Sequence, residues 1–342
     1  MTLGEKGAML RSASACCALI AAIVAALFSP ATASAAVRAG WSWTHLAEAT
    51  SPSPRFWESL AYDPTDQGVI LFGGENDSPR PTDTWLWRPS GWVQLHPPAS
   101  PPGRDLAAMA YDPATAQLVL FSGEGCTGYC NDTWIWSDGT WTEAHPANSP
   151  SPRDGAVMAY DPHTRQLVMF GGNTPACGVN TSGCADTWVW DGANWSLVDT
   201  NGPRVGEGAG VAYDVWTREL VLYGGNNVHD TSTWGWTGSR WLLLNTSGPC
   251  GASEGAMAVD IFGEPVWFEG LGCYPEGTPQ RTFAWTGSKW TPLRTGTVSP
   301  DYRWGSALAF DPPARRDVLF GGNSILEGDV GDTWTLSWSW HA

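Results

Sequence analysis

Charged residues are scarce in this chain, and most of them are acidic. Asp, Glu, Lys and Arg make up 15% of the 342 residues, and 34 acidic side chains against 18 Lys and Arg give a formal net charge of −16. Binding to the phosphates of nucleic acid requires a concentrated basic face, and the sequence has none. We therefore expect no nucleic acid partner, and the acidity fits solubility in a secreted protein.

Long apolar runs are also rare, and the clearest one lies near the N-terminus. Residues 15–28 are apolar, Lys6 and Arg11 precede them, and the small residues of 29–36 follow. This pattern predicts a secretory signal peptide over residues 1–36, cut after the alanine at 33, 35 or 36. The run is short for a membrane span, although an uncleaved anchor is the alternative. We expect a secreted protein, without a membrane span after cleavage.

Helical periodicity is missing as well, whereas a repeat is easily found. An aromatic residue followed by a Gly-Gly-like pair returns every 45 to 53 residues, which is the spacing of four-stranded propeller blades. The marker residues are Phe72, Phe121, Phe170, Tyr223, Phe268 and Phe320. Six copies over residues 37–342 predict a single all-β domain.

Each copy contains four short runs of β-type residues bounded by turn signals. In the third copy they are GAVMAYD, QLVMFGG, DTWVW and NWSLV. Asp-Pro at 63–64, 112–113, 161–162 and 311–312 predicts a tight hairpin between the first two strands. Asp-Gly at 138–139 and 191–192 predicts another between the third and fourth strands.

The combination of Arg, apolar strand, Gly-Gly, Thr-Trp and a spaced Trp resembles Kelch repeats, as in the propeller domain of galactose oxidase. The resemblance implies a six-bladed β-propeller with four-stranded antiparallel blades, and it covers nearly all of residues 40–342. It also implies that the loops after Gly-Gly and before each first strand share one face. The fifth copy departs most, with Val259 in place of Tyr and Glu269 in place of Gly.

The two ends of the repeat predict how the ring closes. Trp43 precedes Arg55 by the 12 residues that separate Trp92 from Arg104, so the first copy is preceded by a fourth strand. We expect residues 41–46 to supply the outer strand of the last blade, which removes an open sheet edge. Alternatively, the SWSW segment at 337–340 fills that place.

Candidate binding residues lie on the loop face that the resemblance implies. Arg55, Arg104, Arg153 and Arg303 are placed by it at the rim of the central channel, where they either satisfy backbone carbonyls or form a partial cationic ring for carboxylate groups. Trp57 and Trp304 lie outside the Trp repeat, next to two of these arginines, and are candidates for stacking on a ligand or for local packing. The loops add Tyr129 and Tyr274.

Catalytic or metal-binding residues are not indicated. Copper chemistry of the galactose oxidase type requires an adjacent Tyr-His pair, and this sequence has no such dipeptide. We expect no cofactor and no metal. The expected protein is a monomeric, non-catalytic scaffold that binds a protein or glycan ligand. A lectin-like role is the alternative, followed by a galactose oxidase-like or sialidase-like enzyme.

Six cysteines remain after the predicted cleavage, an even number that fits an oxidising compartment. The sequence alone allows 15 pairings. Cys126 with Cys130 and Cys177 with Cys184 each share one loop, whereas Cys250 and Cys273 lie on the same face of one blade in the implied fold. We predict disulfides 126–130, 177–184 and 250–273.

Overall fold

The computed structural model describes residues 38–76, 79–177, 183–225, 230–250, 253–271 and 282–341. It divides the chain into a small unit, Met1–Ala39 with Trp340–Ala342, and a large unit, Gly40–Ser339. In the small unit the described residues are the outer ends of two strands, and the predicted signal peptide lies outside the described residues. The fold described below is that of the large unit.

Six four-stranded sheets make up this fold, and each follows one copy of the sequence repeat. Blade 1 contains β2 (Ser59–Asp63), β3 (Gly68–Phe72), β4 (Thr84–Arg88) and β5 (Gly91–Leu95). Blade 2 contains β6 (Ala108–Asp112), β7 (Gln117–Phe121), β8 (Thr133–Ser137) and β9 (Thr140–Ala144). Blade 3 contains β10 (Val157–Asp161), β11 (Gln166–Phe170), β12 (Thr187–Trp190) and β13 (Trp195–Asp199).

The remaining blades continue the series. Blade 4 contains β14 (Ala209–Asp214), β15 (Glu219–Gly224), β16 (Thr233–Trp236) and β17 (Trp241–Asn245). Blade 5 contains β18 (Ala256–Val259), β19 (Pro265–Phe268), β20 (Thr282–Trp285) and β21 (Trp290–Pro292). Blade 6 contains β23 (Ala307–Asp311), β24 (Arg316–Phe320), β27 (Thr333–His341) and β1 (Arg38–Leu46). A small sheet of β22 (Arg303–Trp304), β25 (Asn323–Ser324) and β26 (Gly328–Asp329), and the 3₁₀ turn η1 (Pro175–Cys177), complete the elements.

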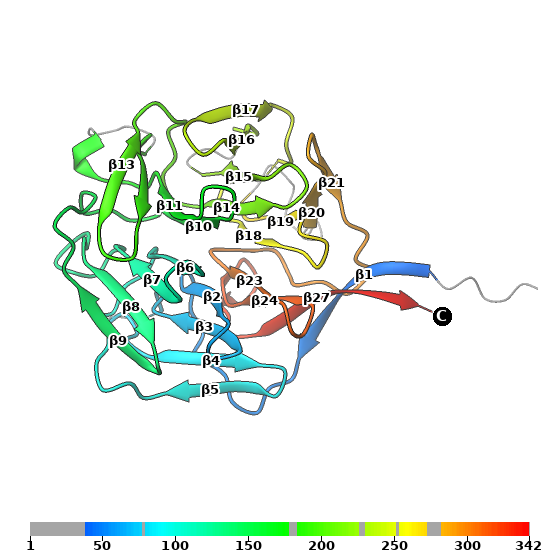
Figure 1. The fold of residues 1–342 in the computed structure, drawn as a ribbon. Helices are drawn as coiled ribbons and strands as arrows, with labels where there is room; N and C mark the ends of the chain where they lie inside the picture. The colour runs from blue at the N-terminus through cyan, green and yellow to red at the C-terminus, as the bar shows by residue number, and fades with distance from the viewer. Residues whose placement is uncertain are drawn as a thin grey trace, which may run out of the picture. The chain divides into compact units, whose positions relative to one another are not determined.

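The first strands of the blades surround the centre of the ring (Figure 1). Each first strand contacts the first strands of both neighbouring blades, and β23 contacts β2, so the circle is closed by packing. The second strands are buried on both faces because the next blade covers them; every residue of β3 is buried. The prediction of a six-bladed all-β propeller is confirmed.

The turns between first and second strands follow the predicted chemistry. The Asp63 carboxylate accepts a hydrogen bond from the backbone N–H of Thr65 at 2.7 Å, and Asp112 does the same with Ala114 at 2.9 Å. Asp214 and Asp260 begin equivalent turns without a following proline. The carboxylate acceptor is therefore the common element of these hairpins, and proline is an addition in four of them.

Tryptophan side chains join each blade to the one before it. The indole N–H of Trp141, at the start of the fourth strand of blade 2, donates to the hydroxyl of Thr84 in blade 1 at 2.9 Å in a buried position. The other pairs are Trp195 to Thr133, Trp241 to Thr187, Trp290 to Thr233, Trp43 to Thr282 and Trp92 to Thr333. This ladder explains six of the repeated tryptophans as structural residues.

The same ladder shows which segment completes blade 6. Trp43 of β1 occupies the fourth-strand place, and the strand order of the sheet is β1-β27-β24-β23. The SWSW segment does not form an outer strand, because it extends the third strand, β27, from Thr333 to His341. The N-terminal segment supplies the outer strand, as predicted.

Candidate functional site

The four repeated arginines are buried, and Arg104 shows the pattern. Its guanidinium donates to both carboxylate oxygens of Asp132 at 2.6 and 2.7 Å. It also donates to the carbonyls of Ser122 and Pro102, at 2.9 and 3.1 Å. Arg55 pairs in the same way with Asp83, Arg153 with Asp186, and Arg303 with Asp332.

These arginines are only 1–2% exposed. They therefore do not form the partial cationic ring at the channel rim that was one of the two interpretations of the sequence. Each arginine precedes the first strand of its blade, and its aspartate partner directly precedes the third strand of the same blade. The ion pair therefore joins these two segments. Burial alone would raise the pKa of Asp132, but hydrogen bonds and charge from Arg104 hold it below its usual range. The geometry fits the other interpretation, in which the arginines satisfy backbone carbonyls at strand entry.

Immediately after these positions, the chain forms an inner ring around the axis. At this position of the repeat, one residue in each blade has a positive φ. Five hydrogen bonds run from the N–H of one such residue to the carbonyl of its neighbour in the ring, at 2.7 to 3.0 Å. The six residues are Trp57, Leu106, Gly155, Gly208, Glu254 and Gly305. Glycine is needed at 155, where a Cβ would lie 2.5 Å from the Cα of Glu207. We call this set the inner ring.

The inner ring lines a cavity of about 140 Å³. The residues that directly follow the inner ring also line it, and they are small in blades 2 to 6. In blade 1 this position is Glu58, which is 6% exposed. Burial raises the pKa of Glu58 to about 8, against the lowering effect of nearby N–H groups and arginine charges.

One side of the opening of this cavity, which we call the mouth, is aromatic. The rings of Phe56 and Trp57 are 4.7 Å apart between centroids, those of Phe56 and Trp304 are 5.0 Å apart, and those of Trp57 and Trp304 are 5.4 Å apart. The structure thus brings the two predicted off-repeat tryptophans together. Trp57 also lines the cavity, so this cluster combines local packing with a surface that faces the mouth.

The other side is acidic, which sequence reasoning missed. Asp105, Asp154 and Glu207 directly precede the inner ring in blades 2, 3 and 4, and Glu254 is part of it in blade 5. Burial and the charge of Glu207 raise the pKa of Asp154 to about 7 and that of Glu254 to about 7. We call these four residues the acidic arc.

Two further carboxylates lie beside this arc because of short backbone bridges. Phe56 pairs with Glu75, and Asp105 pairs with Glu124, each of the glutamates being the residue after a Gly-Gly-like pair. Arg80 is 3.5 Å from Glu124 and also forms an ion pair with Asp105. Burial raises the pKa of Asp105 to about 6 in spite of this partner.

The predicted loop tyrosines and cysteines have mixed outcomes. Tyr129 is 36% exposed and pairs with Glu124 through its backbone, and the charge of Asp154 raises its pKa. Tyr274 lies outside the described residues. Disulfides 126–130 and 177–184 are present as predicted. Cys250 is disulfide-bonded, and Cys273 lies outside the described residues.

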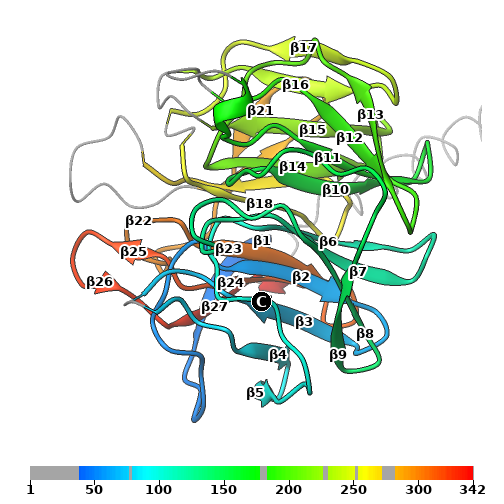
Figure 2. The same ribbon diagram turned by 90° about the vertical axis from the view of Figure 1, so that its left-hand side faces the viewer.

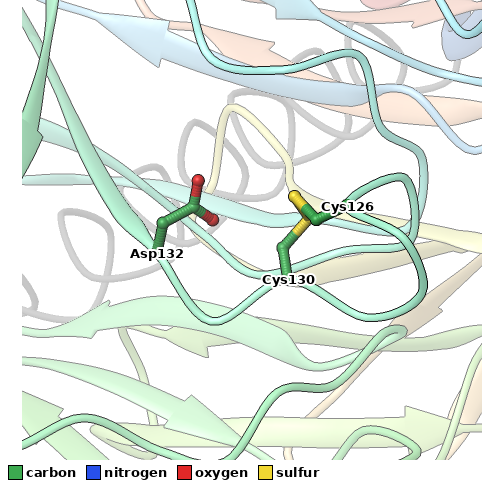
Figure 3. A group of neighbouring side chains, drawn as sticks. All are labelled: Cys126, Cys130 and Asp132. Atoms are coloured by element: carbon green, nitrogen blue, oxygen red, sulfur yellow. A yellow bond between two sulfur atoms is a disulfide. The ribbon is translucent and has the colours of Figure 1, made fainter.

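Two groups of described residues have the spacing of metal ligands, but disulfides account for both. Figure 3 shows the first, in which Cys126 and Cys130 are joined beside Asp132. A sulfur atom in a disulfide is not the thiolate that metals bind, and Asp132 is already paired with Arg104. The second group, Cys177, Cys184 and Asp186, is explained in the same way.

The sequence matches the model of a known protein family. The model of the KLHDC2/KLHL20/DRC7 Kelch-repeats domain matches residues 37–225, which is more than half of the chain. No curated protein matches the sequence.

Proposed function

The chain belongs to the Kelch-repeat family, whose domains mediate protein interactions, and we propose that it is a scaffold that binds a partner protein through its mouth face. We also propose that it is secreted and non-catalytic. The mouth face is defined here as the side that carries the acidic arc, the aromatic cluster and the loops joining second to third strands. The observation that carries the proposal is the contrast between these loops and the opposite turns.

The loops on the mouth face vary, whereas the turns on the other face are uniform. The loops that join second to third strands range from eight residues, 225–232, to sixteen, 171–186. The turns between first and second strands contain four residues in five blades and five in blade 5. Variable loops on a rigid scaffold are where binding residues usually lie.

Apolar side chains on the mouth face support a protein partner. The small sheet places Ile325 and Leu326 in the turn between β25 and β26, where they are 43% and 78% exposed. Figure 2 shows β25 and β26 at the left, and the β2–β3 turn at the right. Contiguous exposed apolar groups rimmed by polar ones mark interaction sites, and this pair is the apolar contact that we propose for the partner.

The opposite face offers a matched comparison, because Trp216 in the β14–β15 turn is 72% exposed. The test is affinity capture from the native medium with the wild-type chain, Leu326→Asp and Trp216→Ser, followed by direct binding measurements with the purified partner. We expect Leu326→Asp to weaken binding and Trp216→Ser to leave it unchanged. The reverse result would place the interface on the turn face.

A glycan array with the same proteins tests the lectin-like alternative. The cluster of Phe56, Trp57 and Trp304 favours that role, whereas the ladder tryptophans are buried. Specific glycan binding without a captured protein would replace our proposal with the lectin-like one.

The proposal that the protein is secreted rests on the pattern of residues 1–36 and on the disulfides. No helix among the described residues is long and apolar enough to cross a membrane. N-terminal sequencing of protein collected from the medium should give a start at residue 34, 36 or 37. Recovery of the intact leader in the membrane fraction would contradict secretion.

A further inference from the structure

The acidic arc contains more carboxylates than basic groups to neutralise them. Arg80 acts on Asp105 at one end of the arc. For Asp154, Glu207 and Glu254, the charged groups that influence their titration within the described part of the chain are other carboxylates. Among the residues that the structure describes, one oxygen of Asp154 and one of Glu254 are buried without a hydrogen-bond partner. Carboxylates collected in this way favour binding of a positive charge.

A second observation, independent of the arc, comes from blade 1. Glu58 is 6% exposed and lines the same cavity as Glu254. Among the described residues neither of its carboxyl oxygens has a hydrogen-bond partner of normal geometry, and the nearby N–H groups of Glu58 and Ala307 offset the effect of burial on its pKa only in part. Leaving a buried acceptor unpaired is costly. The carboxyl lies beside Gly321 of blade 6, so the wall of the cavity contains an unpaired acceptor there as well.

The aromatic cluster indicates what kind of cation fits. Trp57 lines the cavity, and Trp304 packs against it with centroids 5.4 Å apart. Indole faces attract ammonium and guanidinium groups and also pack against their apolar stems. A metal ion is less suitable, because the described residues bring no three carboxylates of the arc together as ligands.

We propose that the mouth binds a lysine or arginine side chain from a basic segment of a partner protein, with the charged group held by Glu254, Asp154 and Glu207 and the stem lying against Trp57 and Trp304. The assignment of this cation to a partner protein rests on the function proposed above. The cavity of about 140 Å³ accommodates one side chain rather than a folded element.

The test uses the oxidised mature chain and a fluorescent tetralysine amide, with anisotropy measured at about 0.15 M salt, where exposed charges more than about 8 Å away are largely screened. We expect Glu254→Gln and Glu207→Gln each to weaken binding at least fivefold. The matched control is Glu143→Gln, which removes one exposed carboxylate from the outer strand β9 and should change binding less than twofold. Replacing Trp304 by Leu should weaken binding about two- to fivefold.

Three outcomes would overturn the inference. They are no binding of tetralysine at about 1 mM, equal binding of its Nε-acetylated form, and equal losses in Glu143→Gln and the mouth variants. Displacement of the probe by spermidine at the same concentration as unlabelled tetralysine would show a small-amine site instead of a protein-segment site. If a captured partner requires Leu326 but tetralysine does not displace it, the proposed function stands and this inference fails.

Discussion

Replacing Arg104 by Ala separates the structural interpretation of the repeated arginines from the ligand-binding one. The change removes two hydrogen bonds to Asp132 and two to backbone carbonyls, all between 2.6 and 3.1 Å. Breaking a buried pair by removing one partner costs about 3–5 kcal/mol. Because Asp132 is 18% exposed and keeps its bond from the Trp134 indole, we expect the lower end, about 3 kcal/mol.

The measurement is denaturant unfolding of the oxidised protein followed by tryptophan fluorescence. Arg294→Ala is the control, because Arg294 is exposed and should change the free energy of unfolding by less than about 0.5 kcal/mol. Replacing both partners, as Arg104→Met with Asp132→Leu, should recover part of the loss. A loss below about 1 kcal/mol in Arg104→Ala, combined with loss of partner binding, would refute the structural interpretation and restore the cationic rim.

Three more predictions concern stability. Burial raises the pKa of Glu58 to about 8 and that of Asp154 to about 7, so above about pH 5 the folded state holds protons that the unfolded chain has lost. Stability measured in thermal melts should therefore fall from about pH 5 to about pH 8, and it should fall less in Glu58→Gln. Trp141→Phe leaves a buried hydroxyl unpaired and should cost about 2 kcal/mol, whereas a similar loss in exposed Trp216→Phe would contradict the importance of the ladder. The side chain of Asp317 is buried and has no hydrogen-bond partner in the described part of the chain. Asp317→Val should therefore raise the free energy of unfolding by about 1–3 kcal/mol, and a decrease would show that the carboxyl is paired.

The fold could be predicted because the residues that hold it recur at a fixed period. The ladder tryptophans, the Gly-Gly pairs and the hairpin aspartates each occupy one place in the repeat, so six weak signals reinforce one another. At Gly73 a Cβ would lie 2.2 Å from the carbonyl oxygen of Arg104, which explains why glycine returns there. Closure by residues 41–46 followed from the same register, since Trp43 stands where the other ladder tryptophans stand.

The site was harder to predict because burial and charge depend on residues far apart in the chain. Asp132 follows Arg104 by 28 residues, so the two are far apart in the sequence. An Asp-Thr-Trp triplet nevertheless occurs in each of the four blades that have the repeated arginine, and it is absent from blades 4 and 5, which lack that arginine. That coincidence was a readable signal for buried pairing. The acidic arc could not be anticipated in the same way, because Asp154, Glu207 and Glu254 belong to three different blades, and their charges interact only when six blades close around one axis.

The shared sheet of β1 and β27 has a consequence for the order of folding during synthesis. β1 leaves the ribosome before any blade exists, and the strand beside which it lies is made last. Blades 1 to 5 can each assemble from a continuous stretch of chain, whereas blade 6 must wait for its final strand. Until then, β1 is an unpaired strand, exposed to mispairing with other chains. The interval between the two strands is therefore the period in which the nascent protein most needs protection by chaperones.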